Sequence, residues 1–172
     1  MALVKAGAIA RVAYASISEK GTVNGAKGDQ TGRELRISDY YSFGQSYYFR
    51  FNESGDAWWI CDIMIRLVNN NRIGYGQNDR LSLRTILLRN GWKSKQVENK
   101  CNCDCSSLVA CAINCIYEKD IMPASTTTST LSSCLKAANI GKVLKIRKDY
   151  RPMPGDIIWK PGKHVVVCVG YE

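Results

Sequence analysis

The stretch DCSSLVACAINCIY, residues 104–117, decides the fold. Its apolar residues recur at intervals of three and four, which is the spacing of one buried face of a helix. Asp104 stands just before the first apolar residue, where an N-cap is expected, because its carboxylate can accept hydrogen bonds from unpaired backbone N–H groups. The pattern therefore predicts a helix that begins at about Cys105 and packs into the core.

Cys105 lies in the first turn of this predicted helix, where free N–H groups and the helix dipole stabilise a thiolate. The same N–H groups can donate to the oxyanion that forms when a carbonyl is attacked. A thiol nucleophile also needs a group that takes and returns a proton near neutral pH, and histidine is the usual choice. The chain has a single histidine, His164, so we expect Cys105 and His164 to act together.

Residues 151–172, RPMPGDIIWKPGKHVVVCVGYE, predict two strands joined by a tight turn. The turn residues Pro-Gly-Asp (154–156) precede the first strand, where Asp156 is expected to cap the turn, and Pro-Gly (161–162) precedes the second. Apart from His164 at its start, the second strand is apolar on both alternating faces. This pattern predicts a central strand of a sheet.

The N-terminal stretch MALVKAGAIARVAYAS favours an amphipathic helix over about residues 3–18. It also has features of a cleaved secretory signal, and that alternative stays open. The glycine-rich loop that follows, residues 21–35, is long for a compact domain, so we expect it to form part of a binding cleft.

Three further helices are expected, over about residues 56–70, 78–90 and 127–138. The first of them is expected to bury its apolar residues, including Trp58 and Trp59. Five cysteines lie in apolar patterns, where cysteine behaves as a small hydrophobe; they are Cys61, Cys111, Cys115, Cys134 and Cys168. The other three, Cys101, Cys103 and Cys105, are expected in a polar loop.

The composition bounds the class of protein. A chain of 172 residues with 45% hydrophobic content suits a single domain, and no stretch approaches the length of an apolar membrane helix. The formal net charge of +9 favours an anionic partner. The lysines and arginines are scattered along the chain, so we expect a solvated basic surface, with nucleic acid a less suitable partner than anionic wall polymers.

Together, DCSSLV, MPGDIIW and HVVVCVG resemble the NlpC-type and CHAP-type cysteine peptidases and amidases, which cut peptide or amide bonds in bacterial cell walls. The family nucleophile opens a helix in a D-C-S-x-x-V setting, matched by Asp104, Cys105, Ser106 and Val109. The family histidine begins a strand after a P-G-D turn, matched by residues 154–156 and His164. The resemblance covers roughly residues 101–172, and the segments GDQTGRE and NNNRIGYGQNDR look like the front half of lysins from phages of Gram-positive bacteria.

The resemblance implies an α+β fold with a papain-like core, in which the nucleophile helix packs on an antiparallel sheet. We expect a single catalytic domain over residues 1–172, with residues 1–100 mainly helical and residues 101–172 holding the nucleophile helix and the sheet. The implied reaction is acyl transfer on peptidoglycan, without a metal or another cofactor. A phage lysin of this kind acts on the cell wall after release from the host cytoplasm, or is secreted. Whether the scissile bond is that of an amidase or of an endopeptidase stays open.

The third, orienting residue of such a site usually lies on the strand after the histidine strand. This chain stops at Glu172, which is the positional candidate. Asp29 and Gln30, in the glycine-rich loop, are the alternatives as orienter or oxyanion donor. Further residues expected to line the cleft are Ser106, Tyr75 and Trp159.

Two other classes of function remain as alternatives. Cys101, Cys103, Cys105 and His164 could form a zinc or redox site, but C-x-C-x-C spacing places neighbouring ligands too close for an easy tetrahedron. A basic wall-binding or nucleic-acid-binding module without catalysis would fit the charge. That reading leaves the settings of Cys105 and His164 unexplained.

Overall fold

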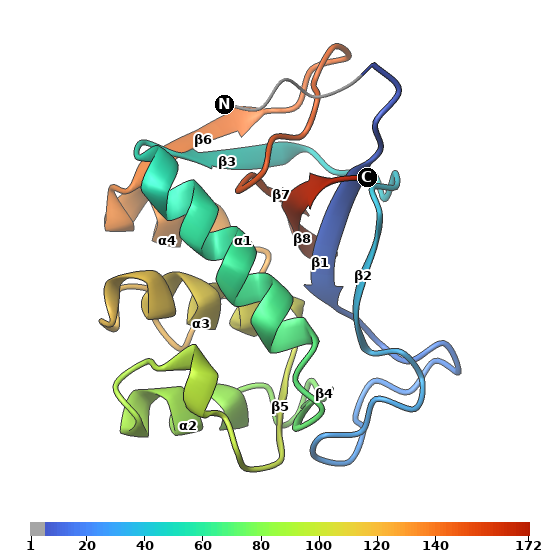
Figure 1. The fold of residues 1–172 in the computed structure, drawn as a ribbon, viewed down its shortest axis with the longest axis vertical. Coiled ribbons are helices and arrows are strands. Elements are labelled where there is room, and N and C mark those ends of the chain that lie inside the picture. Colours follow the sequence, from blue (N-terminus) through green and yellow to red (C-terminus); the bar gives the residue numbers. More distant parts are fainter. Residues whose placement is uncertain (1–5) are drawn as a thin grey trace.

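The computed structural model describes residues 6–172, which form an α+β fold with four α-helices (Figure 1). In chain order the elements are β1 (Ala10–Ala15), β2 (Leu35–Asp39), β3 (Tyr47–Phe51), α1 (Ser54–Val68), β4 (Ile73–Tyr75), α2 (Ser82–Arg89), the short 3-10 helix η1 (Ser94–Gln96), β5 (Cys101–Cys103), α3 (Cys105–Tyr117), α4 (Leu131–Ala138), β6 (Gly141–Lys145), β7 (Ile157–Lys160) and β8 (His164–Tyr171).

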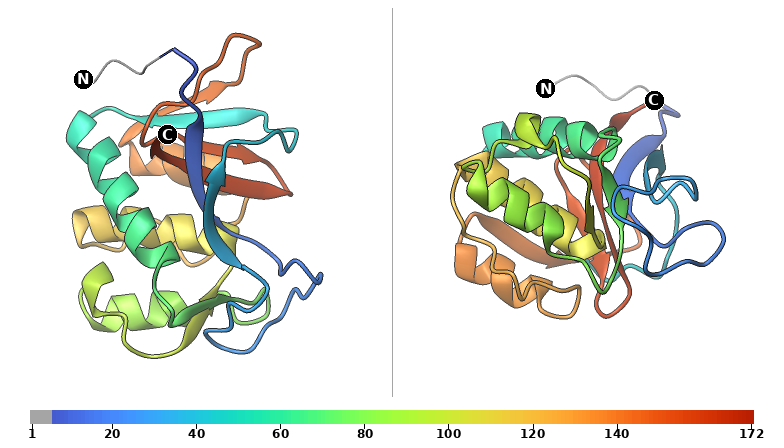
Figure 2. Two further views of the ribbon diagram at one scale, coloured as in Figure 1. Left: turned by 45° about the vertical axis from the view of Figure 1, so that its right-hand side comes forward. Right: turned by 90° about the horizontal axis from the view of Figure 1, so that it is seen from below.

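Six strands form one antiparallel sheet in the order β2-β1-β8-β7-β3-β6. The strand that begins at His164, β8, lies in the middle of this sheet, as its two apolar faces predict. The short strands β4 and β5 pair in parallel, apart from the main sheet. Helices α1 and α3 pack together against one face of the sheet, which both views in Figure 2 show.

The two faces of the sheet carry two separate apolar clusters. Val165 and Val167 point to the helices and belong to the main core, which also includes Trp159 and the buried face of α3. Val166 and Cys168 point to the opposite face, against Tyr14 and a group of other aromatic residues. Strand β8 is therefore buried on both sides, which fixes its register against its neighbours.

The expected nucleophile helix is present with its expected cap. Asp104 accepts a hydrogen bond from the backbone N–H of Ser107, and the Ser107 hydroxyl accepts one from the backbone N–H of Asp104. This reciprocal capping box satisfies two N–H groups at the start of α3. The helix consequently begins at Cys105, as predicted.

The predicted N-terminal helix over residues 3–18 is wrong for the part that the structure describes; its beginning, with Leu3, lies outside the described residues. Residues Ala10–Ala15 form strand β1, which lies between β2 and β8. Successive side chains of β1 point to opposite faces of the sheet, and both faces are covered. The buried residues are Val12, Ala13, Tyr14 and Ala15. A short run that is apolar on both faces has no clear period, so periodicity does not distinguish a strand from a helix here. The high helix propensity of alanine then favours the wrong prediction.

The expectation of a mainly helical front half over residues 1–100 is also wrong. Strands β1, β2 and β3 of the main sheet precede the first helix, α1, which begins only at Ser54. Trp58 and Trp59, expected in the core, are 61% and 48% exposed, because Ile60, Ile63 and Leu67 take the buried face of α1.

Two cysteines expected in a polar loop, Cys101 and Cys103, instead lie in strand β5 and are fully buried. The five cysteines predicted to behave as small hydrophobes do pack in or against the apolar clusters. None of the helices within residues 6–172 combines the length and the apolar character needed to cross a bilayer.

Candidate active site

The thiol of Cys105 is partly buried at the start of α3, next to the backbone N–H of Val165 in strand β8. Three backbone N–H groups lie close enough to favour its thiolate form and lower its pKa: those of Val165, Ser106 and Cys105 itself. Val165 directly follows His164 in the chain. The fold therefore brings the nucleophile candidate to the strand position next to the only histidine.

The pKa of Cys105 nevertheless lies above its ordinary value, at about 11, because burial of the thiol and the nearby Asp104 carboxylate outweigh the N–H groups. This result corrects the expectation that the start of the helix holds the sulfur as a thiolate. The dipole of a helix is a modest effect, whereas desolvation penalises any buried charge. Cys105 is a neutral thiol in this conformation.

The turn that carries Cys105 is held by Arg80. The Arg80 guanidinium contacts the Asp104 carboxylate, with 2.6 Å between Nε and Oδ2, and donates to the backbone carbonyls of Ala124 and Thr126. It also donates to the Ser106 hydroxyl, which in turn donates to Asp104. Ser106, expected to line the cleft, is instead buried and helps to hold the turn that carries Cys105.

His164 is enclosed by aromatic residues on the face of the sheet opposite the helices. Its ring contacts Tyr14 and Phe43 edge-on, each with 5.3 Å between ring centroids. Its Nε2 atom lies 3.0 Å from the hydroxyl of Tyr41. Burial, assisted by the positive charge of Arg36, lowers the pKa of His164 to about 4, so the imidazole is neutral near pH 7.

The Cys105 thiol lies next to the backbone of Val165, which directly follows His164. Within the described chain, however, the thiol and the His164 ring are not hydrogen-bonded to each other. Alternation along β8 turns Val165 toward the helices and the His164 ring toward the aromatic face. The Nδ1 atom of His164 has no hydrogen-bond partner among residues 6–172. The site thus holds a neutral thiol and a neutral imidazole with one ring nitrogen available.

Glu172, the positional candidate for the orienting residue, lies at the far end of β8. It follows His164 by 172 − 164 = 8 residues, which corresponds to about 26 Å along an extended strand. Its carboxylate pairs with Arg11, with 2.8 Å between the charged atoms. The geometry separates Glu172 from His164, because the histidine begins the strand and the glutamate follows its end.

The two loop candidates have local structural partners. The Asp29 carboxylate accepts hydrogen bonds from the backbone N–H and the hydroxyl of Thr31, which lower its pKa. The Gln30 amide donates to the carbonyls of Asn70 and Ile73 and so ties the glycine-rich loop to the end of α1. Neither side chain contacts His164.

The two aromatic candidates differ. Tyr75 is buried at the end of β4, where burial raises its pKa to about 12 and the nearby Cys105 contributes to the shift, so Tyr75 does lie close to Cys105. Trp159 is fully buried in β7, and its indole N–H has no hydrogen-bond partner in the described chain. It belongs to the core rather than to an open cleft.

The residue that the sequence analysis missed is Tyr41, the hydrogen-bond partner of His164. It lies just after β2, in an aromatic stretch that also includes Phe43 and carries no distinctive motif. The signal available was that this stretch follows the long glycine-rich loop, with only the short strand β2 between them. The pairing itself depends on β1 lying between β2 and β8, which brings residues distant in sequence together.

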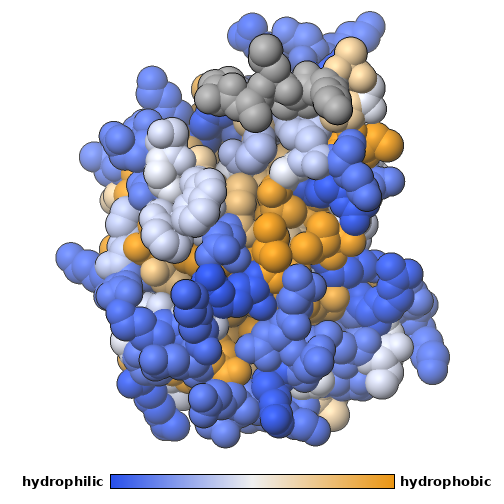
Figure 3. Space-filling model, viewed as in Figure 1, coloured by the Kyte–Doolittle hydropathy of each residue, from blue (hydrophilic) through white to orange (hydrophobic). Residues whose placement is uncertain are grey.

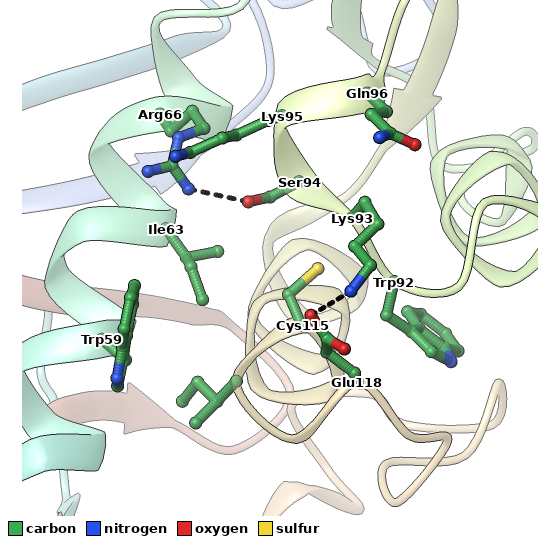
Figure 4. Close-up of a pocket in the computed structure, with 11 residues that line it drawn as sticks. Trp59, Ile63, Arg66, Trp92, Lys93, Ser94, Lys95, Gln96, Cys115 and Glu118 are labelled. Atoms are coloured by element: carbon green, nitrogen blue, oxygen red, sulfur yellow. Dashed lines mark hydrogen bonds and ion pairs between the residues drawn. The ribbon is translucent and has the colours of Figure 1, made fainter.

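Two surface pockets lie away from Cys105. One, of about 340 Å³, lies between α1, η1 and the end of α3, where Figure 4 shows Trp59 and Trp92 on either side and an ion pair between Lys93 and Glu118. Another, of about 710 Å³, lies beside the start of α1 and includes Trp58, Ile65 and Val169. Figure 3 shows apolar surface gathered in the middle of this view, surrounded by hydrophilic residues.

A metal-binding arrangement of three or more His, Cys, Asp or Glu side chains does not occur within the described residues 6–172. Cys101 and Cys103, which the zinc alternative requires as ligands, pack in the main hydrophobic core.

Comparison with known families gives one match. A sequence model described as an endolysin-like domain matches residues 12–171, which is nearly the whole chain. No curated protein and no solved structure matches the chain. The chain therefore belongs to the endolysin-like domain family, whose description indicates a hydrolase with a phage-lysin type of function at the bacterial cell wall.

Proposed function

We propose that this protein is a peptidoglycan hydrolase that cleaves an amide bond through an acyl-enzyme on Cys105, with His164 as the base. The observation that carries the proposal is the position of the Cys105 thiol, which meets the backbone N–H groups of the first turn of α3 and that of Val165, the neighbour of His164. Family membership supports the substrate. The order of nucleophile helix and histidine strand supports an NlpC-type or CHAP-type site in a papain-like core.

The pKa values favour a neutral resting pair. With a thiol pKa of about 11 and an imidazole pKa of about 4, both groups are uncharged near pH 7. The thiol proton therefore moves to His164 as the sulfur attacks the amide carbonyl, rather than before the substrate binds. Bound substrate excludes water and places an electrophile at the sulfur, which allows this transfer.

The remaining steps follow from the same groups. In this mechanism the backbone N–H groups of Cys105 and Ser106, which lie beside the thiol, donate to the oxyanion formed at the carbonyl. The imidazolium then gives its proton to the leaving amine, which breaks the C–N bond and leaves a thioester on Cys105. A water molecule, deprotonated by His164, hydrolyses the thioester and restores the thiol.

The proposal requires His164 to meet the thiol through Nδ1, because Nε2 is occupied by Tyr41. Catalytic hydrogen bonds are often long or absent in a free enzyme and form only in the substrate complex. The ring therefore has to move from the aromatic face of the sheet toward Cys105 when peptidoglycan binds.

The test is digestion of purified peptidoglycan by the wild-type protein and by Cys105→Ala and His164→Ala, with released fragments identified by mass spectrometry. Both variants should lose turnover by at least about 10³-fold, since each removes a group that takes part in bond making or proton transfer. Cys134→Ala is the matched control, because Cys134 is the other partly exposed cysteine and lies on α4. Retained lysis by Cys105→Ala would refute the mechanism.

The same spectra decide the scissile bond. An amidase releases stem peptides that begin with L-alanine, whereas an endopeptidase releases new termini within the stem or the cross-bridge. Binding to cell walls without any new termini would instead support the non-catalytic alternative.

A further inference from the structure

Tyr41 is the only side chain in the described part of the molecule that hydrogen-bonds with His164, with 3.0 Å between its hydroxyl and Nε2. The contact joins residues that are 123 positions apart, so it exists only in the folded chain. Tyr41 is itself held between neighbours: its ring lies 5.6 Å from that of Tyr14 and 5.5 Å from that of Phe43. A partly buried hydroxyl held in this way restrains the ring of its hydrogen-bond partner.

The phenol stays neutral at any working pH. Burial and the adjacent Tyr14 raise the pKa of Tyr41 far above its ordinary value, although Arg36 opposes the shift. A neutral partner acts differently from a carboxylate, because it can fix the tautomer of an imidazole without stabilising the imidazolium. The lowered pKa of His164 agrees with an enclosure that contains no negative partner.

We propose that Tyr41 is the positioning residue of the Cys105–His164 pair, and that its hydroxyl accepts a hydrogen bond from the Nε2–H of His164. This bond keeps the proton on Nε2 and leaves the lone pair of Nδ1 free to receive the thiol proton. The inference rests on the proposed function, in which Nδ1 serves as the base. It assigns to Tyr41 the task that Glu172, Asp29 and Gln30 are not placed to perform.

The exclusion of these three residues follows from their contacts. Glu172 pairs with Arg11 beyond the other end of β8. Asp29 and Gln30 are engaged by Thr31 and by the carbonyls after α1. Tyr14 and Phe43 contact the imidazole through their rings alone, so Tyr41 is the one neighbour that addresses a ring nitrogen.

The experiment compares the wild-type protein with Tyr41→Phe, with Tyr40→Phe as the matched control. Tyr40 is the preceding residue, and its hydroxyl accepts a hydrogen bond from Gln45 instead of contacting the imidazole. Each protein is labelled with ¹⁵N-histidine and purified without a histidine tag, so that His164 is the sole source of signal. The ring nitrogen shifts report the tautomer, and digestion of soluble peptidoglycan fragments gives kcat and KM.

We expect the wild-type protein and Tyr40→Phe to show a single tautomer with the proton on Nε2. Tyr41→Phe should show a mixture of tautomers. Its kcat should fall about five- to tenfold, the range expected for the loss of one neutral hydrogen bond, with KM changed by less than about twofold.

Any one of three results would overturn the inference. A wild-type ring protonated on Nδ1 would make Tyr41 a donor, and an unchanged tautomer or an unchanged kcat in Tyr41→Phe would reduce the contact to packing. Failure of the proposed function is recognised separately, because Cys105→Ala would then retain turnover while the ring nitrogen shifts still report on Tyr41. Urea unfolding of Tyr41→Phe serves as the control for folding, and a midpoint close to that of the wild-type protein shows that the fold is preserved.

Discussion

His164 should make the protein less stable in mild acid, and the size of the effect can be worked out from its burial. The folded-state pKa is about 4, against an ordinary value of 6.5. Above pH 6.5 the imidazole is neutral in both states, so it adds no pH dependence. Between pH 6.5 and pH 4 the unfolded chain binds a proton that the folded chain excludes, and stability is therefore lost as the pH falls through this window.

The magnitude follows from the difference of 6.5 − 4 = 2.5 pKa units. At about 1.4 kcal/mol per unit, the full loss below pH 4 is about 3 kcal/mol, and about 2 kcal/mol of it should appear between pH 7 and pH 5. This is a large share of the free energy of unfolding of an ordinary domain.

The assay is urea unfolding of the wild-type protein and of His164→Gln at pH 7, 6 and 5, followed by tryptophan fluorescence. The carboxylates titrate alike in both proteins, so the difference between the two free energies of unfolding isolates the histidine. That difference should shift by about 2 kcal/mol in favour of the glutamine variant on going from pH 7 to pH 5. A folded-state His164 that titrates near 6.5 by NMR, together with a difference that does not vary with pH, would refute the reasoning.

Three further predictions follow from other parts of the molecule. Alkylation of Cys105 by iodoacetamide should be slow at pH 7 and accelerate as the pH approaches about 11, and Asp104→Asn should move this rise to lower pH, as peptide mass spectrometry can show. Asp156→Asn should lower the free energy of unfolding by about 3 kcal/mol, because it removes the buried carboxylate that pairs with Arg50. Asp39→Asn, at an exposed ion pair, should lower it by less than about 1 kcal/mol, and equal losses in urea unfolding would contradict the burial argument. Added salt should reduce lysis of intact cell walls but not cleavage of small neutral fragments, because salt screens the attraction between the net charge of +9 and anionic wall polymers. Equal effects of salt on the two substrates would count against a role of the charge.

The parts of the fold that the sequence predicts well are those with local causes. Helix α3 follows from its apolar period and from Asp104, whose capping box the structure contains. The turn before β7 follows from Pro-Gly-Asp, and Asp156 does accept a hydrogen bond from the backbone N–H of Met153. In each case residues a few positions apart determine the structure, so no knowledge of the rest of the chain is needed.

The failures arise where distant segments decide. Strand β1 was predicted as a helix because its alanines favour that state, yet β2 and β8 bury both of its faces. The state of Cys105 was misjudged for a similar reason. A helix start favours the thiolate, but the packing around the sulfur and the nearby Asp104 raise its pKa instead.

The sequence by itself therefore determined the candidate catalytic residues: a cysteine that opens a capped helix and a sole histidine that opens a central strand. The endolysin-like family assignment also comes from the sequence. Only the tertiary structure decided their surroundings, namely the neutral state of both groups and the pairing of His164 with Tyr41. The physical reason is that capping and periodicity act over a few residues, whereas desolvation and the contact between β2 and β8 through β1 depend on how the whole chain packs.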